Sequence, residues 1–253
     1  MPREHGAYAQ IAFPLMTALA LGAFSPAPIL LLVAIICIFL AHEPAMVLTG
    51  GRGGRARRET GGQARRRAIL LAAISLATGA AGLWLAPAAA HLATLIPLSL
   101  GVLLIPLIFT RREKTAVGEL LVATTLSSTM IPVAIAGGAS IQVTLGAAAV
   151  WAIAFALGTL TVRAIIARTK RTAESQWPTW IAPTLCAAVI ILAIAAALTS
   201  DLPALAVVAV VPTALVALIF ALMGIHPRNL RRMGWSLVAS NVAVLAGLII
   251  GLV

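Results

Sequence analysis

Long apolar runs separated by short polar segments make up most of this chain. A membrane-spanning helix needs about 20 apolar residues at a rise of 1.5 Å per residue. We expect such spans at residues 8–24, 28–49, 68–86, 90–110, 116–136, 141–162, 179–199, 203–224 and 234–253. The pattern predicts an all-α fold: a polytopic membrane bundle of nine transmembrane helices in a single integral membrane domain, residues 1–253.

The polar segments between these runs alternate between basic and cation-free. All eighteen Lys and Arg residues lie at Arg3 or within 52–67, 111–114, 163–171 and 228–232. The other segments, such as Ser25–Pro28 and Gly137–Ser140, contain none. Because Lys and Arg that flank transmembrane helices stay cytoplasmic, we expect a cytoplasmic N-terminus and an outside C-terminus. A multi-pass protein of the bacterial cytoplasmic (inner) membrane fits this pattern.

Composition supports the same class and limits the partners. The chain is 61% hydrophobic and only 10% charged, whereas soluble domains are about 25% charged. The net charge of +11 lies between apolar runs, so we attribute it to orientation and to attraction for anionic membrane lipid rather than to nucleic-acid binding. The two cysteines, Cys37 and Cys186, lie inside apolar runs and predict small buried side chains without a disulfide.

His42 and Glu43 are ionisable residues inside the second span, His42 roughly 10 Å below its basic end. Pro44 follows and frees the carbonyl of Leu40. Two interpretations stay open: a frayed helix end whose side chains reach the interface, or the lining of a hydrated cavity. Because desolvation disfavours a lone carboxylate, we expect Glu43 to have a cationic or proton-donating partner. The candidates nearest in height are His5, Arg111, Arg112, His226 and Arg228.

Three further polar positions allow a structural and a functional interpretation. Glu119 lies in the first turns of the fifth span, where it either interacts with the helix dipole or neutralises a buried arginine. Arg163 ends the sixth span and either extends to the interface or serves the same site. Asn241 lies inside the last span, where an interhelical hydrogen bond is expected. The Ser/Thr run at 124–129 is expected to help helices pack.

Arginine accounts for sixteen of the eighteen cations. Guanidinium favours bidentate phosphate recognition, although a GC-rich coding sequence explains the same bias. Seven of the arginines fall in residues 52–67, which we expect to form a Gly-rich loop. The candidate substrate-binding residues are Arg58, Arg111, Arg112, Lys114, Glu119, Arg163, Arg168, Arg171, His226 and Arg228. The candidate catalytic residues, for proton transfer, are His42, Glu43 and His5; no metal ligand is predicted, and the cofactor stays open.

Two segments carry a family resemblance. Pro2-Arg3-Glu4-His5-Gly6-Ala7 before the first span and Ala41-His42-Glu43-Pro44 in the second, followed by a Gly-Arg segment, resemble the YwiC-like family of bacterial membrane proteins. Arg111-Arg112-Glu113-Lys114 and Arg231-Arg232-Met233-Gly234 are similar too. The resemblance implies a membrane protein and names no activity.

The nine-helix layout is also similar to that of UbiA-type intramembrane prenyltransferases, which carry one Asp-rich motif at the end of the second helix and another after the sixth. Here the second span contains His42 and Glu43 instead, and the only aspartate, Asp201, lies in a cation-free segment. A Mg²⁺ ion that bridges a diphosphate needs several carboxylate or water oxygens. The similarity therefore implies architecture rather than prenyl transfer.

Three functions remain open at this stage, and neither enzymatic activity nor oligomeric state is decided. The leading hypothesis is a cytoplasm-facing cavity that binds an amphiphile bearing phosphate or diphosphate, as in a UbiA-like relative without the Asp-rich motifs. The alternative is a secondary transporter of a small anion or a proton-coupled solute, which fits the prolines inside spans, Pro14, Pro106, Pro132 and Pro212. The third is an accessory or assembly subunit of a membrane complex.

Overall fold

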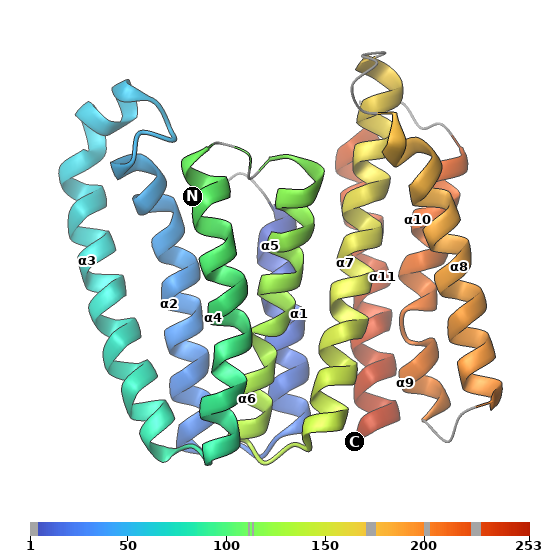
Figure 1. Cartoon of the computed structure of the whole chain (residues 1–253), viewed down its shortest axis with the longest axis horizontal. Coiled ribbons are helices and arrows are strands. Elements are labelled where there is room, and N and C mark those ends of the chain that lie inside the picture. The colour runs from blue at the N-terminus through green and yellow to red at the C-terminus, as the bar shows by residue number, and fades with distance from the viewer. Residues whose placement is uncertain (1–4, 111, 113, 171–175, 200–202, 224–228) are drawn as a thin grey trace.

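The computed structural model describes residues 5–110, 112, 114–170, 176–199, 203–223 and 229–253. These residues form helices joined by short connections, with no strand among them (Figure 1). The helices are α1 (His5–Leu21), α2 (Pro26–Leu48), α3 (Gly54–Leu85), α4 (Ala88–Phe109), α5 (Ala116–Ser128), α6 (Met130–Ala136), α7 (Ile141–Lys170), α8 (Trp177–Thr199), α9 (Ala204–Val208), α10 (Val211–Leu222) and α11 (Leu230–Leu252).

The prediction of an all-α transmembrane bundle is confirmed. Within the described part of the chain, eight helical segments are long and apolar enough to cross a membrane, and α1 is a shorter apolar helix. Two of the eight combine consecutive helices: α5 with α6 forms Ala116–Ala136, and α9 with α10 forms Ala204–Leu222. Each of the nine predicted runs therefore corresponds to one helix or one interrupted pair.

Two helices extend well beyond their predicted spans. α3 begins at Gly54 instead of residue 68, and α7 continues to Lys170 instead of ending at residue 162. The prediction of a Gly-rich loop over residues 52–67 is therefore wrong for most of its length. Arginine is a good helix former, and the charged turns of α3 are exposed, with Arg55 paired to Glu59 four residues later. The apolar span ends where the hydropathy falls, but the helix continues through the charged residues.

Proline sets the position of both helix interruptions. Pro132 is the third residue of α6, and Pro212 is the second residue of α10. Proline lacks an N–H and its ring clashes with the carbonyl four residues earlier. Those carbonyls belong to Ser128 and Val208, the residues at which α5 and α9 end.

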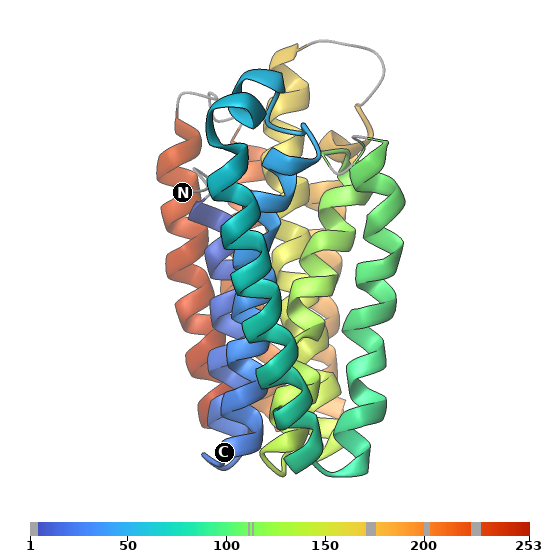
Figure 2. The same cartoon turned by 90° about the vertical axis from the view of Figure 1, so that its left-hand side faces the viewer.

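The helices run between two ends of the bundle (Figures 1 and 2). In Figure 1, α2, α3 and α4 lie on one side, α8 and α10 on the other, and α1, α5, α6 and α7 between them. The α2–α3 and α4–α5 connections lie at what we call the basic end, which includes residues 49–53 and 114–115. The connections at 22–25, 86–87 and 137–140 lie at what we call the opposite end.

An aromatic stack fills the interior between α1 and α7. Trp151 is fully buried, and its ring stacks on Phe13 at a centroid distance of 5.5 Å and on Phe155 at 5.3 Å. The indole Nε1 donates a hydrogen bond of 2.9 Å to Thr17 Oγ1. Because Phe13 and Thr17 belong to α1, the stack fastens α1 to α7 in the core.

Candidate functional site

A cavity of about 1190 Å³ lies among α1, α2, α4, α5, α7, α10 and α11. It reaches the basic end, because residues 49–53 and Lys114 form part of its wall. Ligand sites have volumes of about 300–1,000 Å³, so this space can hold a lipid-sized molecule. A candidate residue can contact a ligand in this space only if it lines the cavity.

Glu43 forms an ion pair with Arg52 at the mouth of the cavity. Arg52 donates from Nε to Glu43 Oε1 at 3.0 Å and from Nη2 to Oε2 at 2.5 Å, a bidentate arrangement. The expected cationic neighbour of Glu43 is thus present, but it is Arg52, nine residues along the chain, which was not among the candidates. The sharp connection after α2, with Gly50 and Gly53 at positive φ, brings Arg52 back over the last turn of that helix.

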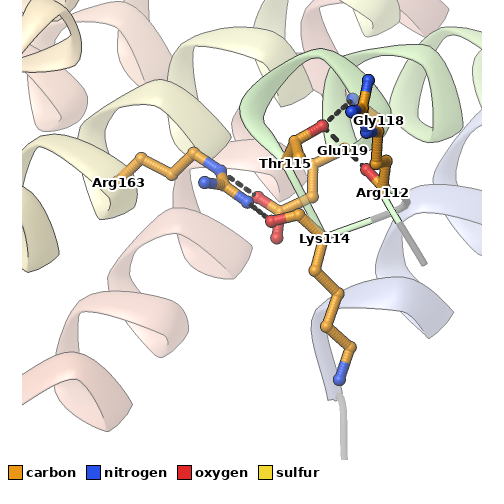
Figure 3. Close-up of polar contacts among 6 residues, drawn as sticks. All are labelled: Arg112, Lys114, Thr115, Gly118, Glu119 and Arg163. Carbon is orange, nitrogen blue, oxygen red and sulfur yellow. Dashed lines mark hydrogen bonds and ion pairs between the residues drawn. The ribbon is translucent and has the colours of Figure 1, made fainter. Parts of the chain in front are cut away.

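A second ion pair joins α5 to α7 (Figure 3). Arg163 Nε donates to Glu119 Oε2 at 2.6 Å, and the Arg163 Nη2 donates to the backbone carbonyl of Lys114. Thr115 caps α5 by accepting a hydrogen bond from the Gly118 amide at 3.2 Å. Glu119 is therefore a counter-ion for Arg163, and of the two only Glu119 lines the cavity.

The other candidate residues fall into three groups. His42 and Lys114 both line the cavity and are both exposed. The Lys114 amine points away from the Glu119–Arg163 pair (Figure 3). Three candidates are exposed and do not line the cavity: Arg58, Arg112 and Arg168. His5 begins α1 but its side chain is not described, and the remaining candidates lie outside the described residues: Arg111, Arg171, His226 and Arg228.

Neutral polar residues line the cavity at mid-depth, and sequence reasoning did not assign them to a site. Thr213 is the middle residue of the Ala204–Leu222 span, Asn241 is the middle residue of α11, and Thr125 lies near the middle of Ala116–Ala136. The predicted interhelical hydrogen bond of Asn241 is confirmed: Thr213 Oγ1 donates to its Oδ1 at 3.0 Å. Their common signal in the sequence is a polar residue at the centre of an apolar run.

An apolar wall of the cavity faces the surroundings between α2 and α4. Ile38 on α2 and Phe109 on α4 both line the cavity and are 61% and 75% exposed. Leu104 and Ile108 continue this wall along α4. The cavity therefore reaches the lipid-facing surface as well as the basic end.

The described residues offer no cluster of three or more His, Cys, Asp or Glu side chains that could hold a metal ion. The carboxylates at the mouth, Glu43 and Glu119, are each engaged by an arginine. The described wall of the cavity thus supplies hydrogen-bonding groups, two arginine-paired carboxylates and the imidazole of His42.

The model of the YwiC-like protein family matches residues 1–136. The chain belongs to the YwiC-like family. The match ends at the last residue of α6, so the cavity of this YwiC-like protein lies between the matched helices and α7, α10 and α11. No curated protein and no solved structure matches the chain. The family membership and the apolar helices together make it a multi-pass integral membrane protein.

Proposed function

We propose that this YwiC-like protein binds an amphiphile whose anionic head carries a phosphate or diphosphate. One observation carries the proposal: a single cavity has charged groups at the basic end and lipid-exposed apolar side chains between α2 and α4. An amphiphile needs both environments at once, since its head must be paired or hydrated while its chain stays in hydrocarbon.

The head group would lie at the mouth of the cavity. Lys114 lines the mouth, and its ammonium is turned away from the neighbouring ion pair, which suits contact with a phosphate (Figure 3). Arg52, on the α2–α3 connection, lines the same cavity and adds the positive charge of its planar guanidinium to the mouth. His42 lines the same mouth and is the candidate for proton transfer, because an imidazole can both donate and accept a proton. Glu43, held by Arg52, acts as a positioning residue for that guanidinium.

The proposal includes orientation and location. With the basic end in the cytoplasm, as the placement of Lys and Arg favours, the mouth opens to the cytoplasm in the bacterial inner membrane. The whole chain then acts as a single membrane domain, and the apolar wall between α2 and α4 faces the cytoplasmic leaflet. A head group could enter from that leaflet without crossing the hydrocarbon.

Binding of decyl phosphate to the purified protein in detergent tests the proposal. We expect saturable binding by isothermal calorimetry, about tenfold weaker for Lys114→Ala because a charge-assisted hydrogen bond contributes roughly 1.5–3 kcal/mol. Arg168→Ala is the matched control, since Arg168 is an exposed cation outside the cavity. Equal affinities of both variants and the parent, or no saturable binding, would refute the proposal.

Transport is a second candidate function, and two observations favour it. The cavity extends to polar residues at span midpoints, and two spans are interrupted helices, as in many transporters. Uptake of inorganic phosphate into proteoliposomes under a pH gradient, abolished by His42→Ala, would place transport first. Prenyl transfer is less well supported, because both mouth carboxylates are engaged by arginines and neither is available to hold Mg²⁺.

A further inference from the structure

The deep part of the cavity differs from its mouth in having only neutral polar side chains. We propose that Asn241, with Gln10 and Thr213, forms a second subsite that takes an uncharged hydrogen-bonding group of the ligand, a hydroxyl or a carbonyl. This inference rests on the proposed function, because it assigns the deep end of a molecule whose anionic head lies at the mouth.

Asn241 is the residue that points most directly to a ligand. It is only 6% exposed, it lines the cavity, and it is the middle residue of α11. Its Oδ1 accepts the hydrogen bond from Thr213, whereas its amide nitrogen has no partner among the described residues. Among the described residues, every side-chain nitrogen or oxygen that is fully shielded from solvent has a hydrogen-bond partner. The Asn241 nitrogen must therefore open onto the cavity instead of being sealed in the protein.

The proton count around Thr213 leads to the same conclusion. Ser240 Oγ donates to the carbonyl of Leu237 at 2.9 Å, so it can only accept from Thr213, whose Oγ1 lies 3.0 Å away. Thr213 has one proton for both Ser240 and Asn241. Turning the amide of Asn241 would exchange its nitrogen and oxygen, but one of the two still faces the cavity. A hydroxyl group on the ligand can donate or accept and so satisfies either arrangement.

Gln10 supplies a second amide from a different helix. It lies on α1, which packs against α11, and it is half-buried in the cavity wall. Its side chain makes no hydrogen bond to the described residues, so its amide can bond a group that enters the cavity. Two amides that line one cavity from neighbouring helices can hydrogen-bond the same ligand group.

The absence of charge at this depth determines the class of group that is bound. The ionisable residues that line the cavity within the described chain all lie near the basic end: His42, Glu43, Arg52, Lys114 and Glu119. A charged group at mid-membrane would have no counter-ion there and would be costly to bury. Asn241 lies eleven residues after Leu230, the first residue of α11, so the neutral group should lie about 16 Å below the basic end of that helix. Phe155 lines the cavity and stacks on the buried Trp151.

Decyl phosphate and its ω-hydroxy derivative form a matched pair of probes for this subsite. They share the head and the chain, and only the second carries a neutral polar group at the far end. We expect the parent protein to bind the ω-hydroxy probe about tenfold more tightly, the effect of one hydrogen bond. Asn241→Leu should remove that preference, so that the variant binds the two probes with equal affinity.

Two further variants separate a lost contact from a lost fold. Gln10→Leu removes an amide that holds no other described residue, so it should reduce the hydroxyl preference without lowering the thermal unfolding midpoint. Ser236→Ala is the control: it removes a polar group from the exposed side of α11, where Ser236 donates only to the Arg232 carbonyl. This control should keep the full preference.

The outcomes distinguish this inference from the proposed function. Equal binding of both probes to the parent protein would overturn the subsite and leave the anionic mouth standing. If neither phosphate probe binds, the proposed function fails. The binding of decanediol, which carries hydroxyl groups but no charge, then tests the subsite independently of the anionic head. Binding of decanediol to the parent but not to Asn241→Leu would support it, and no binding to the parent would overturn it.

Discussion

The two ends of this bundle hold their helices together in different ways. At the opposite end, backbones touch directly: a Cβ on Gly137 would lie 2.9 Å from the Gly22 Cα, and the Ala23 amide donates to the Gly137 carbonyl at 2.7 Å. Gly251 of α11 similarly approaches the backbone of Ala206 in α9. At the basic end, long side chains bridge helices that stand around a cavity, as Glu119 and Arg163 do between α5 and α7.

This difference follows from what each residue type can do in a membrane. Lipid gives little hydrophobic driving force between helices, so small residues that permit close backbone approach supply the packing. The opposite end uses that device and brings backbones into direct contact. The basic end uses charged pairs, which need water or a polar ligand beside them, and so keeps a space open. The comparison predicts that stability depends mainly on one end and binding on the other.

The largest expected effect concerns the side of the membrane to which each end belongs. A cysteine at Ala139, in the cation-free connection at the opposite end, should react with an impermeant maleimide in intact cells. A cysteine at Gly62, exposed on the basic extension of α3, should react only after the cells are opened, because the basic end faces the cytoplasm. The reverse labelling would overturn the proposed orientation, and with it the cytoplasmic mouth.

Trp151→Ala should produce the largest loss of stability. The substitution removes a fully buried indole, its two ring stacks and its hydrogen bond to Thr17. Truncation of a buried Trp costs about 3–5 kcal/mol, which should lower the thermal unfolding midpoint markedly in detergent. Trp84→Ala is the matched control, because Trp84 is 88% exposed. Similar shifts for the two variants would mean that the stack does not hold α1 against α7.

Gly137→Ala should have the next largest effect. Its new methyl group would meet the backbone of Gly22 and Ala23, which cannot yield as a flexible side chain can, and overpacking costs about 1–3 kcal/mol. Gly146→Ala in α7 provides the control, since no atom lies within 4 Å of its added Cβ. That helical substitution should be neutral or slightly stabilising. An unchanged unfolding midpoint for Gly137→Ala would show that the opposite end is not tightly closed.

Much of the fold could be predicted from the sequence because spans are local features. Apolar length located the spans, and Pro132 and Pro212 occupy the two that the structure interrupts. The helical extension of α3 was missed, since hydropathy reports where a helix leaves the apolar layer and not where it ends. The turn that returns Arg52 to Glu43 depends on backbone angles at Gly50 and Gly53 that composition does not reveal.

The site was harder to predict because its residues come from separate helices. The sequence indicated that Glu43 needed a cation and that Glu119 was a possible counter-ion for an arginine, since an ionisable residue in a span must be paired or hydrated. It could not indicate that Asn241 and Thr213 face the same cavity, because that depends on how α10 and α11 pack. A polar residue at a span centre predicts an interhelical contact, and only packing decides whether a cavity adjoins it.

The smallest expected effect tests the ion pair that bridges the mouth. Glu119→Gln removes the charge that holds Arg163, but the Glu119 side chain is 41% exposed, so the loss of stability should stay below about 1 kcal/mol. A double-mutant cycle of Glu119→Gln with Arg163→Gln should give a coupling energy that falls as salt is added. Glu59→Gln on the exposed part of α3 breaks a comparable pair with Arg55 and should change nothing measurable. A coupling energy as large as the loss from Trp151→Ala would show that the mouth, and not the aromatic stack, holds α7 against the first six helices.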